Sequence, residues 1–124
     1  MSHGPGPRGV VRIAAPHDAP DRLDGRWAHW LTEHERAYAL GLARAEEHLL
    51  ARRTAKEAVA ELLALPGPPP WQEMEIRRSA GGAPRLHLSG GLAERVRDSG
   101  PAVPCVSLTH ARGYAAALAW WAAP

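Results

Sequence analysis

Apolar residues recur at the spacing of a helix in one segment near the middle of the chain, residues 52–63. At 100° per residue, Ala55, Val59 and Leu63 fall on one arc. The opposite arc carries four charged residues: Arg53, Lys56, Glu57 and Glu61. This pattern predicts an amphipathic helix that buries its apolar face. The simplest interpretation of the charged face is a solvated surface with local ion pairs.

Short apolar and β-branched runs predict strands on both sides of that helix. Residues 9–15 read GVVRIAA and favour a first strand. Residues 71–77 and 85–88 alternate apolar and polar positions, and the turn residues between them predict a hairpin. Two further strands, 103–110 and 114–120, are joined by the tight turn Ala111-Arg112-Gly113.

Helix signals complete the order of elements. Thr32 followed by Glu35 is a capping box and predicts a helix start. The central helix is expected from Glu46 to Leu65, where five residues rich in proline stop it, and a short helix covers 91–98. The order predicts an α+β fold, with an antiparallel sheet packed on the central helix. We expect one domain over residues 9–124 and a disordered tail over residues 1–8.

Composition limits the class of protein. A chain of 124 residues with 45% hydrophobic and 23% charged residues is typical of one soluble domain. It has no apolar run long enough for a membrane span and no export-signal pattern at its start. Cys105 is the single cysteine, which excludes an internal disulfide, so we expect a cytoplasmic protein.

Basic residues are unevenly distributed. The net charge is only +2, yet eight of the arginines lie in the first half of the chain. Such a surface suits nucleic acid, an acidic protein or a phosphorylated ligand. No nucleic-acid-binding motif accompanies it, so nucleic acid is the least favoured partner. Lys56 is the only lysine among 15 basic residues, which singles out the charged face of the central helix.

Two segments could carry chemistry. One is the pair Lys56 and Glu57 on the central helix. The other is the strand segment 107–110, which ends in His110 at a tight turn. Ser107 and His110 are three residues apart and point to opposite faces of a strand, so the spacing disfavours a Ser/His hydrolase.

Several motifs, taken in order, resemble one known family. Residues 52–58 read RRTAKEA, which resembles the (G)R-F-A-A-K-E-A helix of the holo-acyl-carrier-protein synthases, the small 4′-phosphopantetheinyl transferases. The VSLTH and YAAA of residues 106–117 resemble the ending V-S-[IL]-[ST]-H-x-x-x-Y-A-x-A of this family. Weaker matches are EMEI at 73–76, GAP at 82–84, and RWA with LTEHE between residues 26 and 35.

The resemblance implies a fold and a reaction. The implied fold is that of the phosphopantetheinyl transferases. Members of this family are typically trimers with sites between the subunits, so the resemblance implies a homotrimer here. The reaction moves 4′-phosphopantetheine from coenzyme A to a serine of an acyl carrier protein and releases adenosine 3′,5′-bisphosphate. Because this is phosphoryl transfer at a pyrophosphate, magnesium suits it.

The resemblance also implies roles for particular residues. Glu57 is the expected magnesium ligand, and Lys56 and His110 are expected to act with it near the coenzyme A phosphates. The implied coenzyme A site comprises Arg52, Lys56, Pro84, Ser107, Thr109 and His110. Arg22 and Arg26 are expected to face the acidic carrier protein, which their charge would attract.

Departures from the family pattern concentrate at metal and phosphate contacts. The first strand of the family carries an aspartate that is the second magnesium ligand, whereas residues 9–13 contain no acid. Arg12 is expected near the metal position, where a guanidinium would repel Mg²⁺, and Asp18 or Asp21 could substitute for the missing ligand. In addition, the family's helix lysine is replaced by Glu61, its phenylalanine by Arg53, and its turn lysine by Ala83.

Two alternatives to a transferase therefore stay open. One is a catalytically degenerate homologue that binds an acyl carrier protein or coenzyme A without transferring phosphopantetheine. The other is an enzyme with repurposed chemistry in the same cleft. A transferase is expected to need Mg²⁺ and Glu57, whereas a binding module is expected to hold the carrier protein without either.

Overall fold

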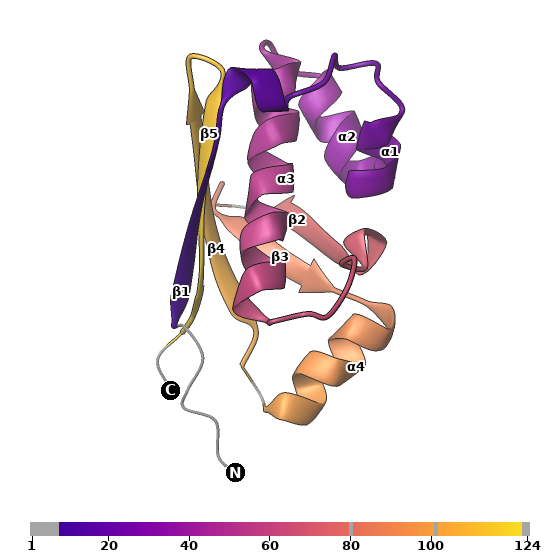
Figure 1. Cartoon of the computed structure of the whole chain (residues 1–124), viewed down its shortest axis with the longest axis vertical. Coiled ribbons are helices and arrows are strands. Elements are labelled where there is room, and N and C mark those ends of the chain that lie inside the picture. Colours follow the sequence, from indigo (N-terminus) through magenta and orange to yellow (C-terminus); the bar gives the residue numbers. More distant parts are fainter. Residues whose placement is uncertain (1–7, 80, 101, 123–124) are drawn as a thin grey trace.

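The long helix α3 (Ala45–Leu62) forms the centre of the molecule, which is described here from a computed structural model covering residues 8–79, 81–100 and 102–122. A three-stranded sheet covers one side of α3, and the remaining helices and a two-stranded hairpin lie on the other (Figure 1). Besides α3, the elements are β1 (Gly9–Ala14), α1 (Arg26–Trp30), α2 (Glu33–Leu40), β2 (Met74–Arg78), β3 (Pro84–Leu88), α4 (Gly90–Ser99), β4 (Pro104–Ala111) and β5 (Tyr114–Trp121).

Both sheets are antiparallel. The larger one has the strand order β1-β5-β4, so the first and last strands of the chain pair with each other. The smaller one is the hairpin of β2 and β3. The predicted α+β class and both predicted hairpins are confirmed. Of the expected tail, residues 1–7 lie outside the described residues.

The core follows the apolar face of α3. Ala55, Val59 and Leu62 pack with Val106 of β4 and Ile76 of β2 in one apolar cluster. A second cluster, around Trp27, Leu31 and Leu50, holds α1 and the start of α2 against the first half of α3. No helix among the described residues combines the length and apolar character needed to cross a bilayer.

One helix was not expected from the sequence, and several element boundaries differ from the sequence-based expectations. The helix α1 was not predicted, because its five residues are too few to show a period. Residues Trp71–Glu73 form a 3₁₀ turn, so β2 starts only at Met74. The central helix ends at Leu62 instead of Leu65, because the backbone becomes left-handed at Ala64 (φ 52°) and the Leu65 amide donates back to the Ala60 carbonyl.

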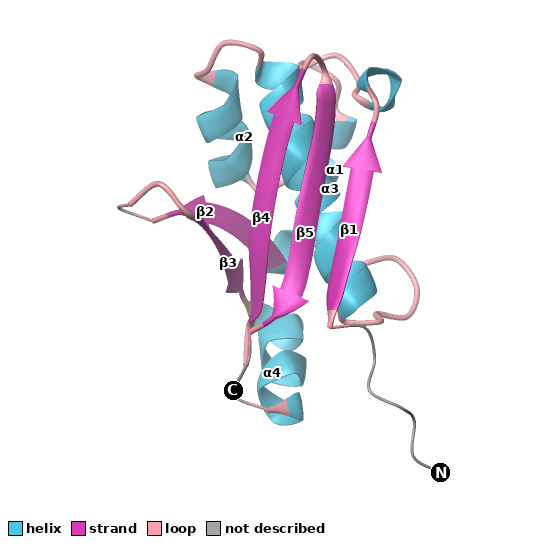
Figure 2. Ribbon diagram, turned by 90° about the vertical axis from the view of Figure 1, so that its left-hand side faces the viewer, coloured by secondary structure: helices cyan, strands magenta, loops and turns pink. Residues whose placement is uncertain are grey.

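None of the described helices covers the second face of the three-stranded sheet. Figure 2 shows β4, β5 and β1 side by side, with the helices behind them. Val11 of β1 is paired with Leu118 of β5, and both side chains are exposed on this face. Ile13, two residues after Val11, has 74% of its surface exposed. An apolar face of this kind in a soluble protein is typical of a contact with another chain.

Candidate active site

Lys56 does not lie on a solvated face. Its Nζ donates to Glu35 Oε1 at 2.8 Å, and both side chains are 0% exposed. The prediction that Lys56 shares the solvated face of the helix is therefore wrong. The countercharge comes from α2, 21 residues earlier in the chain, and a helical wheel of α3 alone contains no information about it. Burial lowers the pKa of Lys56, while the neighbouring Glu35 carboxylate acts in the opposite direction.

Glu35 also binds two backbone amides. The Thr32 amide donates to Glu35 Oε1 at 2.8 Å, which is one half of the predicted capping box at the start of α2. The Ile76 amide donates to Glu35 Oε2 at 2.7 Å. The carboxylate thus joins α2, α3 and β2 at one buried point, and it fixes the position of the helical turn that carries Glu57.

Glu57 points to a different side of α3, toward β1. Its Oε2 lies 4.0 Å from an Arg12 guanidinium nitrogen, and its Oε1 lies 4.0 Å from Arg53 Nε. Arg12 also donates to Glu61 Oε1 at 3.3 Å. The four residues form an alternating row of charges along the α3–β1 contact, in the order Arg53, Glu57, Arg12 and Glu61. We call this row the charge ladder.

Arg53 is the fixed member of the charge ladder. Its guanidinium lies 4.6 Å from the ring centre of Trp30 and 5.6 Å from that of Trp27. One of its nitrogens donates to the Asp18 carbonyl at 3.1 Å. With only 12% of its side chain exposed, Arg53 is held in place and positions one side of the Glu57 carboxylate.

The residues present do not form a good magnesium site. Each oxygen of Glu57 has a guanidinium at 4.0 Å, and a dication 4 Å from one such charge is repelled by about 2 kcal/mol even at the dielectric constant of water. Asp18, one proposed substitute, uses its carboxylate to accept from the Ala15 amide at 2.8 Å. Within residues 8–79, 81–100 and 102–122, no three of His, Cys, Asp and Glu gather into a possible metal site.

His110 lies at the far end of α3 from Glu61, in contact with the first turn of the helix. Its Nδ1 is 3.5 Å from Glu47 Oε1, and its ring lies 4.3 Å from that of His48. The Gly113 amide donates to the same Glu47 oxygen at 3.0 Å and lowers the pKa of that carboxyl. Burial, followed by the charges of His110, Arg52 and Arg78, lowers the pKa of His48.

Arg52 continues this cluster toward the β2–β3 hairpin. It is buried, its guanidinium lies 4.5 Å from the ring centre of Tyr38, and it donates to the His48 carbonyl at 3.4 Å. Arg78 approaches the same tyrosine ring at 5.6 Å, and its register partner on β3 is Pro84. Burial, reinforced by the charge of Arg78, lowers the pKa of Arg52. We call Arg52, Arg78, His48 and His110 the cationic cluster.

The predicted coenzyme A residues are therefore only partly brought together. Arg52, His110 and Pro84 lie in or beside the cationic cluster. Lys56 is one helical turn away and buried. Ser107 and Thr109 alternate with the helix-facing residues of β4 and are exposed on the open face of the sheet, away from His110. Tyr38, Glu47 and Arg78 were missed by the sequence reasoning, because only the tertiary fold brings them to this place.

Of the predicted carrier-binding residues, Arg26 is held in place by an aspartate. Its guanidinium donates to both oxygens of Asp24 at 3.0 Å, and this bond lowers the pKa of Asp24 to about 2. Arg22 is exposed in the loop before α1, next to Leu23, which has 80% of its surface exposed. The loop before α1 and the first residue of that helix thus offer two arginines, one of them paired with Asp24, and one exposed apolar side chain.

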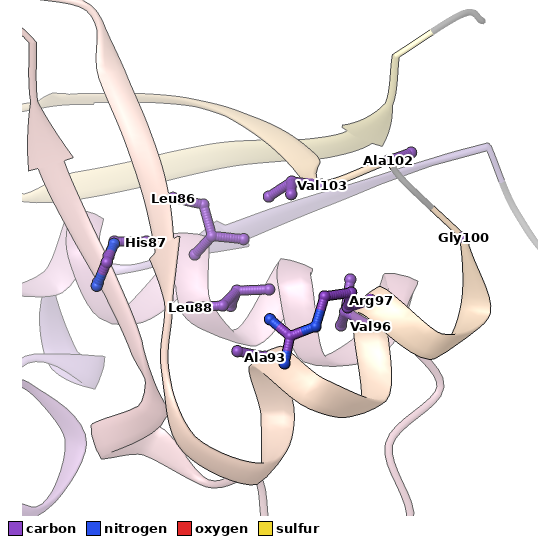
Figure 3. Close-up of a pocket in the computed structure, with 9 residues that line it drawn as sticks. All are labelled: Leu86, His87, Leu88, Ala93, Val96, Arg97, Gly100, Ala102 and Val103. Carbon is purple, nitrogen blue, oxygen red and sulfur yellow. The ribbon is translucent and has the colours of Figure 1, made fainter.

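A hollow of about 360 Å³ lies between β3 and α4, apart from these clusters. Leu86 and Leu88 point toward α4, and the Arg97 side chain reaches back toward Ala93 (Figure 3). None of the predicted site residues lines it.

Comparisons with known proteins identify the family, although no family model matches the chain. It is 41% identical over 93 residues to the holo-[acyl-carrier-protein] synthase of Moorella thermoacetica, covering 74% of this chain and 73% of that one. It is 37% identical over 109 residues to the corresponding synthase of Streptomyces coelicolor, covering 88% and 86%. The solved Chronobacterium ammoniagenes ACPS–CoA complex superimposes with a TM-score of 0.76 at 25% identity, covering 92% of this chain and 95% of that chain.

These relationships confirm the resemblance in the sequence motifs, and the solved structure confirms the predicted fold. They extend over most of the length of each chain. The chain therefore belongs to the holo-[acyl-carrier-protein] synthase family.

Proposed function

We propose that this chain transfers 4′-phosphopantetheine from coenzyme A to a serine of an acyl carrier protein. The observation that carries the proposal is the identity of 37–41% to holo-[acyl-carrier-protein] synthases over most of both chains. The serine oxygen attacks the phosphorus that carries the pantetheine, and the bond from this phosphorus to the bridging oxygen breaks. Adenosine 3′,5′-bisphosphate leaves with that electron pair, and the serine proton passes through a water molecule to the Glu57 carboxylate.

The cationic cluster is the proposed site for the 3′-phosphate of coenzyme A. It supplies the guanidiniums of Arg52 and Arg78, and protonation of His48 would add charge when an anion binds. A ligand phosphate would stabilise the charged forms of Arg52 and His48, whose pKa values burial lowers in the free chain. Pro84 borders this cluster on β3.

Lys56 and Glu57 have different proposed roles. Lys56 is a positioning residue, because its ammonium is occupied by Glu35 and has no exposed surface. Glu57 lies beside β1 with 30% of its side chain exposed to solvent, and it remains the proposed catalytic carboxylate. Magnesium at Glu57, which the family resemblance implies, stays a prediction that the two neighbouring guanidiniums disfavour, and no step above depends on it.

The carrier protein is proposed to dock on the loop before α1. Arg22 of this loop and Arg26 at the start of α1 provide the guanidiniums, of which that of Arg26 is paired with Asp24, and the exposed Leu23 provides apolar contact. An acidic carrier would be attracted to this loop over a distance of about 10 Å at ordinary salt. A cytoplasmic location, where the single cysteine stays reduced, is part of the same proposal.

A homotrimer is proposed from the open face of the sheet. Val11, Ile13 and Leu118 expose an apolar surface that another copy of the chain could bury. In such an assembly, Ser107 and Thr109 would lie near the subunit contact, which would reconcile their exposure with the predicted role in coenzyme A binding.

The test is the intact mass of an apo acyl carrier protein after incubation with this chain and coenzyme A, with and without magnesium. Transfer adds one phosphopantetheine to the carrier, and a carrier whose acceptor serine is changed to alanine serves as the control. A folded sample that binds the carrier without forming the adduct would favour the binding module. No binding and no adduct across several carriers would overturn the proposal.

A further inference from the structure

Strand β1 brings a single charged side chain to α3. Along β1, Val10 and Ala14 face the helix and are buried, and Arg12 lies between them on the same side. Its guanidinium reaches both carboxylates of the charge ladder, Glu61 at 3.3 Å and Glu57 at 4.0 Å. No acid of β1 accompanies Glu57 at this point of the molecule.

The pair of Arg12 and Glu61 reverses the charges that the family motifs imply. Those motifs have an acid in the first strand and a lysine one helical turn after the glutamate. Here both signs are exchanged, and the two side chains contact each other directly. A single substitution would have left a repelling pair, whereas the double exchange keeps the attraction. The two substitutions, Arg12 for the acid and Glu61 for the lysine, therefore change the charge that β1 presents to a ligand. They do not destabilise the contact between β1 and α3.

The Arg12 guanidinium can exchange its contact with the Glu61 carboxylate for a contact with a phosphate group of a ligand. Its side chain is 42% exposed, and exposed ion pairs of this kind are weak, so little stability is lost when a ligand oxygen replaces Glu61. Arg53 lacks this freedom, because two tryptophan rings and the Asp18 carbonyl hold it. A guanidinium can bind two phosphate oxygens at once and stays protonated at neutral pH.

We propose that the Arg12 guanidinium binds the pyrophosphate of coenzyme A in this chain, and that binding and transfer need no divalent cation. This inference rests on the proposed function. Arg12 stays protonated throughout, and it neutralises the charge that develops on the bridging oxygen as the bond to phosphorus breaks. Glu57 and Glu61 hold the guanidinium in place before coenzyme A arrives.

Calorimetric titration with coenzyme A, in excess EDTA and in excess magnesium chloride, tests the binding half of this inference. We expect the two dissociation constants to agree within about threefold. Arg12→Gln should weaken binding about tenfold or more in EDTA, because a charge-assisted hydrogen bond is lost. Arg95→Gln, at an exposed arginine of α4, is the matched control and should bind as the unchanged chain does.

The double variant Arg12→Asp/Glu61→Lys tests the charge reversal itself. It places a second carboxylate beside Glu57, which is the ligand type magnesium prefers. We expect this variant to bind coenzyme A more tightly with magnesium than with EDTA, in contrast to the unchanged chain. Circular dichroism would establish that each variant is folded before titration.

Two results would overturn the inference: coenzyme A binding that requires magnesium in the unchanged chain, or unaltered binding by folded Arg12→Gln. A failure of the proposed function looks different. In that case no carrier adduct forms under any condition, while the EDTA titration still reports whether Arg12 holds the pyrophosphate. An adduct that forms only with magnesium would leave the transferase intact and exclude the metal-free role of Arg12.

Discussion

Lys56 Nζ lies 2.8 Å from Glu35 Oε1 in a place that solvent does not reach. The same carboxylate accepts hydrogen bonds from two backbone amides, so its charge is shared among three elements of the fold. This arrangement places an ion pair beneath the helical turn that presents Glu57 to β1. The stability of that turn and the position of the proposed catalytic carboxylate therefore depend on the same contact.

Removal of either charge of the Lys56–Glu35 pair should lower the stability of the fold. Lys56→Met leaves the Glu35 carboxylate buried without its countercharge, and we expect it to lower the free energy of unfolding by about 3–5 kcal/mol. Urea denaturation monitored by circular dichroism measures this. The double variant Glu35→Gln/Lys56→Met should recover part of the loss, and Glu94→Gln on exposed α4 should change little. A loss below about 1 kcal/mol for Lys56→Met would contradict the buried pair.

The stacking of Arg53 against the tryptophans should also be measurable. Arg53→Met keeps the apolar stem but removes the cation over Trp30 and the hydrogen bond to the Asp18 carbonyl. We expect a loss of about 1–2 kcal/mol in the free energy of unfolding, together with a changed tryptophan emission spectrum. Arg95→Met is the control and should leave both unchanged. Identical unfolding curves for Arg53→Met and Arg95→Met would contradict the stacking of Arg53 against the tryptophans.

A charge placed on the open sheet face should break the proposed assembly. Ile13→Arg introduces a guanidinium into the row of exposed apolar residues, and we expect the trimer mass to fall to that of a monomer. Light scattering after size-exclusion chromatography measures the mass. Leu23→Arg, at an equally exposed residue in the loop before α1, should leave the trimer intact. A monomeric unchanged chain would contradict the assembly from the start.

Stability should fall on mild acidification. His48 has a folded pKa below its ordinary value of 6.5, owing to burial and then to the charge of His110, so the unfolded state binds its proton at higher pH. The free energy of unfolding is thus highest above pH 6.5 and decreases as the pH drops toward the folded pKa of His48. Nearby Glu47, with its lowered pKa, extends the decrease below pH 4.5.

The measurement is a series of thermal unfolding curves between pH 7.5 and pH 3, at constant salt. His48→Gln should reduce the loss of stability just below pH 6.5. It should leave the loss below pH 4.5, which is due to Glu47. Because His110, Arg52 and Arg78 also face His48, His110→Gln should make the decrease shallower but should not abolish it. Stability that rises between pH 7 and pH 5.5 would contradict the sign of the His48 shift.

Local patterns in the sequence predicted most of the fold. The alternation predicted over residues 71–77 and 85–88 and the period of α3 depend on neighbours a few positions apart, so they are visible in the sequence. The capping box at Thr32 formed both of its expected bonds. The pairing of β1 with β5 joins residues about 100 positions apart, and no local pattern contains it.

The candidate site was less predictable, because its contacts are distant in sequence. Glu57 and Arg12 were both singled out, and the structure brings them within 4.0 Å of each other. The partner of Lys56 was not foreseen, although Glu35 was noted as a capping residue. The capping motif accounts for Glu35 in the sequence, and nothing in that motif indicates that the same carboxylate also forms a buried ion pair.

The most direct test of the account compares the rate of carrier modification by the unchanged chain and by Glu57→Gln, measured as intact mass against time. Glu94→Gln, which removes an exposed carboxylate from α4, is the matched control. The account predicts adduct formation by the unchanged chain and the control, and a loss of about a hundredfold or more for Glu57→Gln. Equal rates for Glu57→Gln and Glu94→Gln would contradict the assignment of the reaction to the charge ladder on α3.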